Sequence, residues 1–162
     1  FRTIRNEIRK AAPGRLYLGC RFSEVNPLAA RAAAKFCDVV SFNRYQRNLH
    51  GQDFAVGDKP VIIGEFHFGA LDRGMFHTGL VPVASQAERA EAYKEYVRSA
   101  LKHPNVVGTH WFKWSDEPLT GRAYDEENYQ IGFVDVTDTP YPETVKAVRE
   151  IGDVMYRVRL GK

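Results

Sequence analysis

Residues 59–79, KPVIIGEFHFGALDRGMFHTG, decide the fold of this chain. The run Val61–Ile63 stands between a proline and a glycine, and a carboxylate follows at Glu65. A short β-branched run bounded in this way predicts a buried strand of the kind found in parallel sheets. Functional groups of parallel α/β proteins gather at the carboxyl ends of the strands, so Glu65 is a candidate site residue. The pattern leaves open a second interpretation, in which Glu65 is a solvated strand end or the partner of an arginine.

Strands and helices are expected to alternate along the rest of the chain. Strands are predicted at 16–22, 37–42, 61–66 and 105–114. Helices are predicted over the opening residues, at 27–36, at 86–102 behind a Ser-x-x-Glu capping box, and from 142 to about 157. Loops are predicted at 46–59, 69–84 and 115–128, with a short extended piece at 129–136.

This alternation predicts an α/β protein with a parallel sheet. Two architectures fit: a small doubly wound sheet, or half of a (β/α)8 barrel, since a complete barrel needs about 200–250 residues. No glycine-rich phosphate motif follows the first strand, which weakens a nucleotide-binding interpretation. We expect residues 1–162 to be a single fragment of one domain.

Composition excludes several classes of function. Hydrophobic content of 44% and charged content of 27% are typical of globular domains. The net charge is only +3, and the lysines and arginines are interspersed with acidic residues, which argues against nucleic-acid binding. No apolar run is long enough to cross a membrane. Cys20 and Cys37 fall in different predicted strands and are expected to be reduced core residues. The opening residues are too charged for a signal peptide and suggest a chain that begins inside a larger fold.

Three stretches carry a resemblance to a known family: GEFHFGALDRGMFHTGL, GTHWFKWSDEPLTGR and ENYQIGFVDVTDTPYPE. They resemble the carboxyl-terminal part of clan A retaining glycoside hydrolases, most of all the family 50 β-agarases and more distantly the family 42 β-galactosidases. The resemblance implies the carboxyl-terminal half of a (β/α)8 barrel, strands five to eight with their helices. It implies Glu65 as the nucleophile, Tyr45 as its hydrogen-bonding partner and Trp114 as the floor of a sugar subsite. A secreted or periplasmic location is implied as well.

The sequence departs from the family in one respect. A retaining mechanism needs two carboxyl groups about 5–5.5 Å apart, and the family's acid/base glutamate closes strand four, which would precede residue 1. Neither Glu24 nor Glu117 matches the pattern for that role. We therefore expect half an active site, with little or no hydrolysis by the chain alone.

The residue types also indicate which side chains surround Glu65. A nucleophilic carboxylate must stay ionised, which favours donors such as Asn43 and Tyr45 at the next strand end, although both also fit an ordinary turn. Arg21 could bind sugar hydroxyls or pair with a carboxylate, and one of the two tryptophans is expected to pack against a helix. The candidate substrate-binding residues are Arg21, Asn43, His67, His110, Trp111, Trp114, Asp116 and Glu117. The histidine spacing fits no zinc template, so no metal and no cofactor are expected.

The predicted function is hydrolysis of a β-linked galactose-containing polysaccharide, agarose-like by resemblance. The expected partners are this substrate and the missing amino-terminal half barrel. Three alternatives remain: a β-galactosidase of smaller galactosides, a non-catalytic carbohydrate-binding half barrel that self-associates through exposed strand edges, and a doubly wound domain unrelated to sugar.

Overall fold

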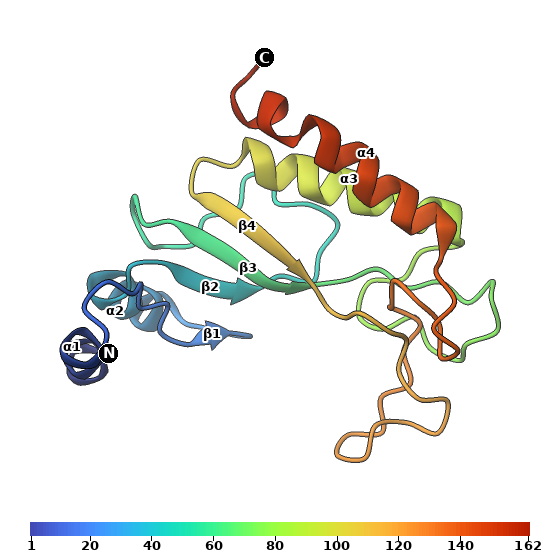
Figure 1. Cartoon of the computed structure of the whole chain (residues 1–162), viewed down its shortest axis with the longest axis horizontal. Helices are drawn as coiled ribbons and strands as arrows, with labels where there is room; N and C mark the ends of the chain where they lie inside the picture. Colours follow the sequence, from blue (N-terminus) through green and yellow to red (C-terminus); the bar gives the residue numbers. More distant parts are fainter.

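Four parallel strands form one sheet whose order follows the chain, β1-β2-β3-β4 (Figure 1). The computed structural model describes all residues, 1–162. The elements are α1 (Arg2–Ala11), β1 (Arg21–Phe22), α2 (Pro27–Phe36), β2 (Val40–Asn43), β3 (Val61–Phe66), α3 (Gln86–Lys102), β4 (Val106–Trp111) and α4 (Pro142–Arg159). The predicted alternation and parallel sheet are confirmed. No helix has both the length and the apolar character needed to cross a membrane.

The strands predicted at 37–42 and 105–114 form with shorter bounds, and two other predicted extended segments differ more strongly from the structure. The strand predicted at 16–22 shortens to Arg21–Phe22 because Gly19, with a φ of 68°, breaks the extended backbone. The segment before Gly19 is held instead by Asp38, whose carboxylate accepts a hydrogen bond from the Tyr17 N–H at 2.8 Å. The segment 129–136 makes only isolated bridges and is no strand.

One face of the sheet carries the hydrophobic core. Phe42, Ile63 and Phe66 belong to a cluster of 20 buried residues that also holds Ala33 of α2 and Tyr96 of α3. Figure 1 shows α3 and α4 lying side by side along β4, with α1 and α2 nearer to β1. Because side chains alternate along a strand, the helices cover only the face to which these residues point.

The opposite face carries Ile62 between small and polar residues. Ser41, Ile62 and Gly108 are register partners on neighbouring strands, and a Cβ added to Gly64 would contact the side chains of Arg21 and Ser41. None of the described helices contributes to a core on this side. The polar residues of this face lie on the side of the sheet that continues to the carboxyl ends of the strands.

A buried arginine ties together the loops beyond those strand ends. Arg89 of α3 is fully buried and donates to the carbonyl oxygens of Phe68 at 2.8 Å and Gly132 at 2.6 Å, and to Gln86 Oε1 at 3.1 Å. Its guanidinium also lies over the Trp111 ring. Arg89 therefore links the loop after β3 to the loop after β4.

Amide and carboxyl side chains extend this network. Gln130 accepts from Gln86 at 2.8 Å and from the Ala70 N–H at 3.0 Å, and its amide donates to Asp116 at 3.2 Å. Asp116 also accepts from the Tyr141 hydroxyl at 2.6 Å, next to the start of α4. A set of satisfied buried polar groups of this kind fixes the course of both loops.

Candidate active site

Glu65, near the end of β3, is contacted by three side chains from two neighbouring segments, β1 and the end of β2. Its Oε2 accepts from the Asn43 amide at 2.7 Å and from the Tyr45 hydroxyl at 2.6 Å. Its Oε1 pairs with the Arg21 guanidinium at 2.6 Å. The Glu65 side chain is 13% exposed, so the carboxylate is enclosed by these donors but still reached from one side.

Strand register explains why these residues meet. Arg21 lies beside Ser41, and Asn43 lies beside Glu65, because the β2–β3 pairing shifts register between Phe42 and Asn43. Gly64 has no side chain, so the Arg21 stem can cross the sheet: a Cβ there would lie 2.2 Å from Arg21 Cδ. Arg21 reaches Glu65 because this glycine leaves the space.

The surroundings of Tyr45 keep its hydroxyl group protonated, so that it can donate a hydrogen bond. Burial, together with the hydrogen bond to Glu65, raises the pKa of Tyr45 well above the ordinary value for tyrosine. The phenol therefore stays protonated at neutral pH and donates to the carboxylate. The Asn43 Oδ1 atom, by contrast, is buried and has no hydrogen-bond partner within the chain.

His67 lies below the site rather than in it. Its side chain belongs to the buried residues, its Nε2 accepts from the Leu80 N–H at 2.9 Å and its Nδ1 donates to the Phe112 carbonyl at 3.2 Å. Burial lowers the pKa of His67 to about 4, so the ring is neutral. With both nitrogens occupied and the side chain buried, the structure does not place His67 as a direct substrate ligand, which differs from the expectation.

Trp111 and Asp116 are also turned to the interior; Trp111 is the tryptophan that packs against a helix, α3, and neither residue is placed as a substrate ligand. The Trp111 indole N–H donates to the Ile131 carbonyl at 2.7 Å, and its ring packs on Phe66 and Phe133. Asp116 is 4% exposed and belongs to the buried network described above. Both residues support the loops and are not placed to touch a ligand at Glu65.

Glu117 is fully buried as well. It accepts from the Tyr129 N–H at 3.0 Å and pairs with Arg122 at 3.2 Å, and burial raises the pKa of its carboxyl. Arg122 also pairs with Asp125 and Glu127, so one guanidinium holds the loop 115–128 by three carboxylates. The substrate-binding role expected of Glu117 is therefore replaced by a structural one.

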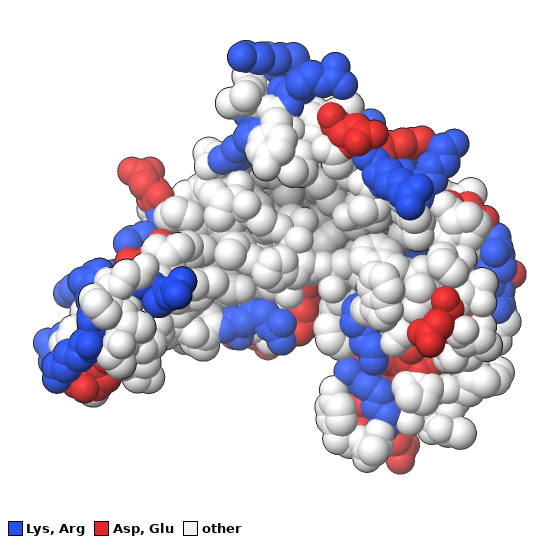
Figure 2. Space-filling model, in the orientation of Figure 1, with Lys and Arg blue, Asp and Glu red and all other residues white.

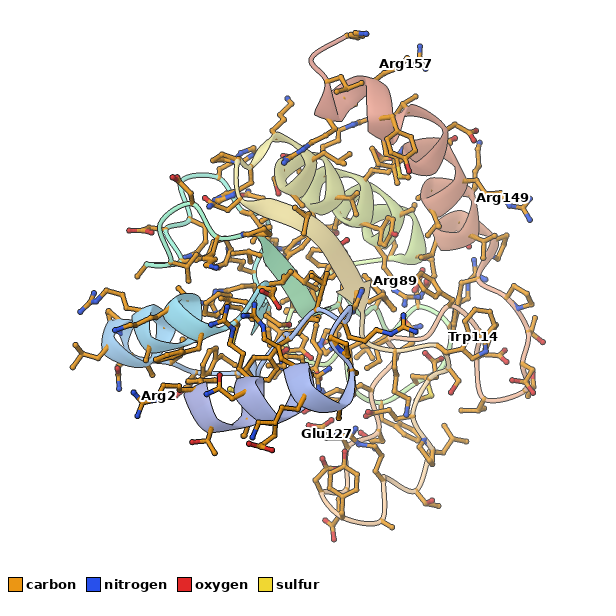
Figure 3. The ribbon with its side chains drawn as sticks, turned by 60° about the vertical axis from the view of Figure 1, so that its left-hand side comes forward. Arg2, Arg89, Trp114, Glu127, Arg149 and Arg157 are labelled. Carbon is orange, nitrogen blue, oxygen red and sulfur yellow. The ribbon has the colours of Figure 1, made fainter.

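Trp114 and His110 keep exposed side chains. Trp114 is 69% exposed just beyond β4, with Phe133 behind it. His110 is exposed on β4. Figure 3 shows Trp114 and Glu127 in the region of the loops after β4, and Arg89 near the end of that strand.

The surface next to the strand ends is hollowed. Figure 2 shows a notch between the part of the molecule that contains β1, α1 and α2 and the loop that projects after β4, and acidic and basic atoms adjoin there. No group of three or more His, Cys, Asp or Glu side chains is arranged to hold a metal ion. Sequence reasoning missed Arg122, because nothing in a loop's sequence shows which residues it brings to the strand ends.

A carboxylate held by donors at the carboxyl end of a parallel sheet is an arrangement typical of α/β enzymes. No family model matches the chain. It is 46% identical, over its whole length, to β-agarase B of Vibrio sp. (strain JT0107), of which it spans 18%, and 45% identical to β-agarase A of the same organism, of which it spans 17%.

Solved structures agree with these relatives. A crystal structure of an agarase is 47% identical, with a TM-score of 0.93 over 98% of this chain and 23% of that one. An exo-β-agarase is 50% identical, with a TM-score of 0.91 over 97% of this chain and 22% of that one. The chain is thus homologous to a portion of the β-agarases, which are glycosidases, and it spans about a fifth of the length of the relatives it matches. The resemblance expected from the sequence is confirmed at this level.

Proposed function

We propose that the chain is the carboxyl-terminal half of a (β/α)8 barrel, strands five to eight, from a retaining glycoside hydrolase. Its substrate is a β-linked galactose-containing polysaccharide of the agarose type. The three donors that converge on Glu65 carry this proposal, and the β-agarase relatives supply the substrate class.

The sheet supports a half barrel over a doubly wound domain. A doubly wound sheet reverses its strand order and carries helices on both faces. Here the order runs β1-β2-β3-β4 without reversal, and the core lies on one face. In a closed barrel the other face, with Gly64 and Gly108, would line the interior.

The chemistry follows from the contacts of Glu65. Its carboxylate attacks the anomeric carbon, the glycosidic C–O bond breaks, and a glycosyl ester forms on Glu65. Tyr45 and Asn43 hold Oε2 by hydrogen bonds and Arg21 pairs with Oε1, so the free lone pair of Oε1 is oriented for attack. A second carboxyl group protonates the leaving oxygen and later activates water, and we assign it to a part of the protein outside these residues.

Substrate contacts are assigned to the remaining exposed groups. The Arg21 guanidinium, 53% exposed, donates to a sugar hydroxyl beside its contact with Glu65. Trp114 offers an exposed aromatic face for a sugar ring, with His110 as a further hydroxyl ligand. These roles are expectations from geometry and exposure.

The partner of this half is the rest of the barrel. β1 and β4 are edge strands, and beside β4 an apolar groove of about 550 Å³ runs between α3 and α4. Unpaired strand edges next to apolar surface favour pairing with another strand. Docking of the missing half would bury both features.

The experiment combines this chain with the amino-terminal half of a related β-agarase and measures hydrolysis of agarose and of an aryl galactoside. We expect agarose oligosaccharides only from the mixture. Preference for the aryl galactoside would favour a β-galactosidase instead. Sugar binding without hydrolysis in the mixture, or a stable dimer of the chain that excludes the added half, would support a non-catalytic fragment and contradict the proposal.

Gly64→Ala is expected to lower kcat/KM about tenfold, because the new methyl group displaces the Arg21 stem from its place beside Glu65. Gly108→Ala is the matched control, since its Cβ would lie 3.7 Å from Ile62 in ordinary contact. Steady-state kinetics of the complemented enzyme measure both. Equal activity of the two variants would show that the Arg21 contact does not matter to Glu65.

A further inference from the structure

We infer that His67 is a positioning residue that acts on Glu65 through Tyr45. The inference rests on the proposed role of Glu65, but its evidence is the geometry of three side chains. The His67 ring lies against the Tyr45 ring, with centroids 4.6 Å apart, and the Tyr45 hydroxyl donates to Glu65 at 2.6 Å. Whatever fixes the His67 ring also fixes the phenol.

The His67 ring is fixed in one tautomer. The Leu80 N–H can only donate, so Nε2 must be the unprotonated acceptor. The proton is therefore on Nδ1, which donates to the Phe112 carbonyl. One bond comes from the loop after β3 and the other from the segment after β4, so the ring cannot rotate without breaking both.

The backbone of the loop 69–84 has the conformation that brings the Leu80 N–H to His67. Gly79 has a φ of 73°, and a Cβ there would lie 2.6 Å from His67 Nε2. Only a residue without a side chain brings the Leu80 N–H this close. The close approach explains why the loop 69–84 contains a glycine at this position.

Further aromatic rings pack near His67. The Tyr129 ring stands edge-on to His67, with centroids 6.1 Å apart, and His77 stacks on Tyr129 at 4.8 Å. The rings thus form a series from the loop 69–84 to the carboxylate. Tyr45 has the buried, immobile ring of His67 on one side, which limits the directions its hydroxyl can take.

The test separates the ring of His67 from its hydrogen bonds. His67→Gln keeps an acceptor and a donor for the two backbone groups but removes the ring behind Tyr45. His67→Phe keeps a ring of similar shape but loses both hydrogen bonds. NMR exchange of the Tyr45 hydroxyl proton with water, measured on the 162-residue chain, reports the hydrogen bond to Glu65. Urea unfolding of each variant reports stability.

We expect both variants to speed exchange but only one to lose stability. His67→Gln speeds exchange of the Tyr45 hydroxyl proton about tenfold or more, the scale of losing a hydrogen bond to a charged group, with little loss of stability. His67→Phe has a ring that neither hydrogen bond fixes, so it lowers stability and speeds exchange by about threefold or more. Exchange at the parent rate in either variant would overturn the inference.

If His67→Gln fails to fold, the His67→Phe result still decides. The readout involves no hydrolysis, so it is independent of the substrate. Loss of the proposed glycosidase function would appear in the complementation assay, whereas failure of the positioning role would appear only in the exchange rates.

Discussion

Replacing Glu65 by glutamine is expected to lower agarose hydrolysis by the complemented enzyme by about four orders of magnitude or more, the scale of removing a catalytic nucleophile. An uncharged amide cannot form the glycosyl ester. The substitution keeps the shape of the side chain that Tyr45 and Arg21 hold, so binding of the two halves should be unaffected. Release of reducing ends from agarose measures the loss.

Glu24→Gln is the matched control for this prediction. Glu24 is an exposed carboxylate that follows β1, and it is not among the side chains that bond to Glu65, which are Asn43, Tyr45 and Arg21. Its substitution should leave the rate within about twofold, since exposed changes away from a site have small effects. Hydrolysis that survives Glu65→Gln would mean that another carboxylate is the nucleophile. The assignment of this half of the site would then be wrong.

The sequence predicts secondary structure best where the hydrophobic pattern of a segment agrees with the capping or turn residues at its ends. The strand 61–66 and the helices 27–36 and 86–102 form at the predicted positions. Each helix is bounded by a recognisable signal, since Asn26 and Ser85 accept a backbone N–H at the two helix starts. The segment 16–22 shows the limit, since its apolar residues suggest a strand but Gly19 bends the chain out of the sheet.

The candidate site is predictable where it depends on the sheet alone. Carboxyl ends of neighbouring parallel strands lie together, so the strand pattern is enough to place Asn43 and Tyr45 beside Glu65. Arg21 joins them for the same reason. What these residues share is a position next to a strand end, which the hydrophobic pattern locates.

Residues on the loops cannot be placed in this way. His67 and Glu117 differ from Glu65 in burial, although all three follow or end a strand. The register shift in β3 between Ile63 and Phe66 breaks the alternation that would have shown which way each side chain points. The partners that bury them, Leu80 and Arg122, come from distant parts of two loops.

Arg89 carries no signal in the sequence. In a helix that begins QAERAEAYKEY, one more charged residue is expected on the solvated face. Its burial depends on carbonyl groups left free by two irregular loops, and these are features of the folded chain only. Burial lowers the pKa of Arg89 to about 10, so it remains charged at neutral pH and must keep its acceptors.

Arg89→Met is therefore expected to lower the free energy of unfolding by about 3 kcal/mol, measured by urea titration at neutral pH. Methionine retains the apolar stem against Trp111 but leaves the Phe68 and Gly132 carbonyls buried without donors. Removing the buried guanidinium also removes the free-energy cost of desolvating its charge, which offsets part of this loss of stability. Arg149→Met, an exposed position on the outer side of α4 (Figure 3), should change stability by less than about 0.5 kcal/mol. If both variants unfold at the same urea concentration, the loops are held by packing alone, and the buried guanidinium is not what fixes the strand ends around Glu65.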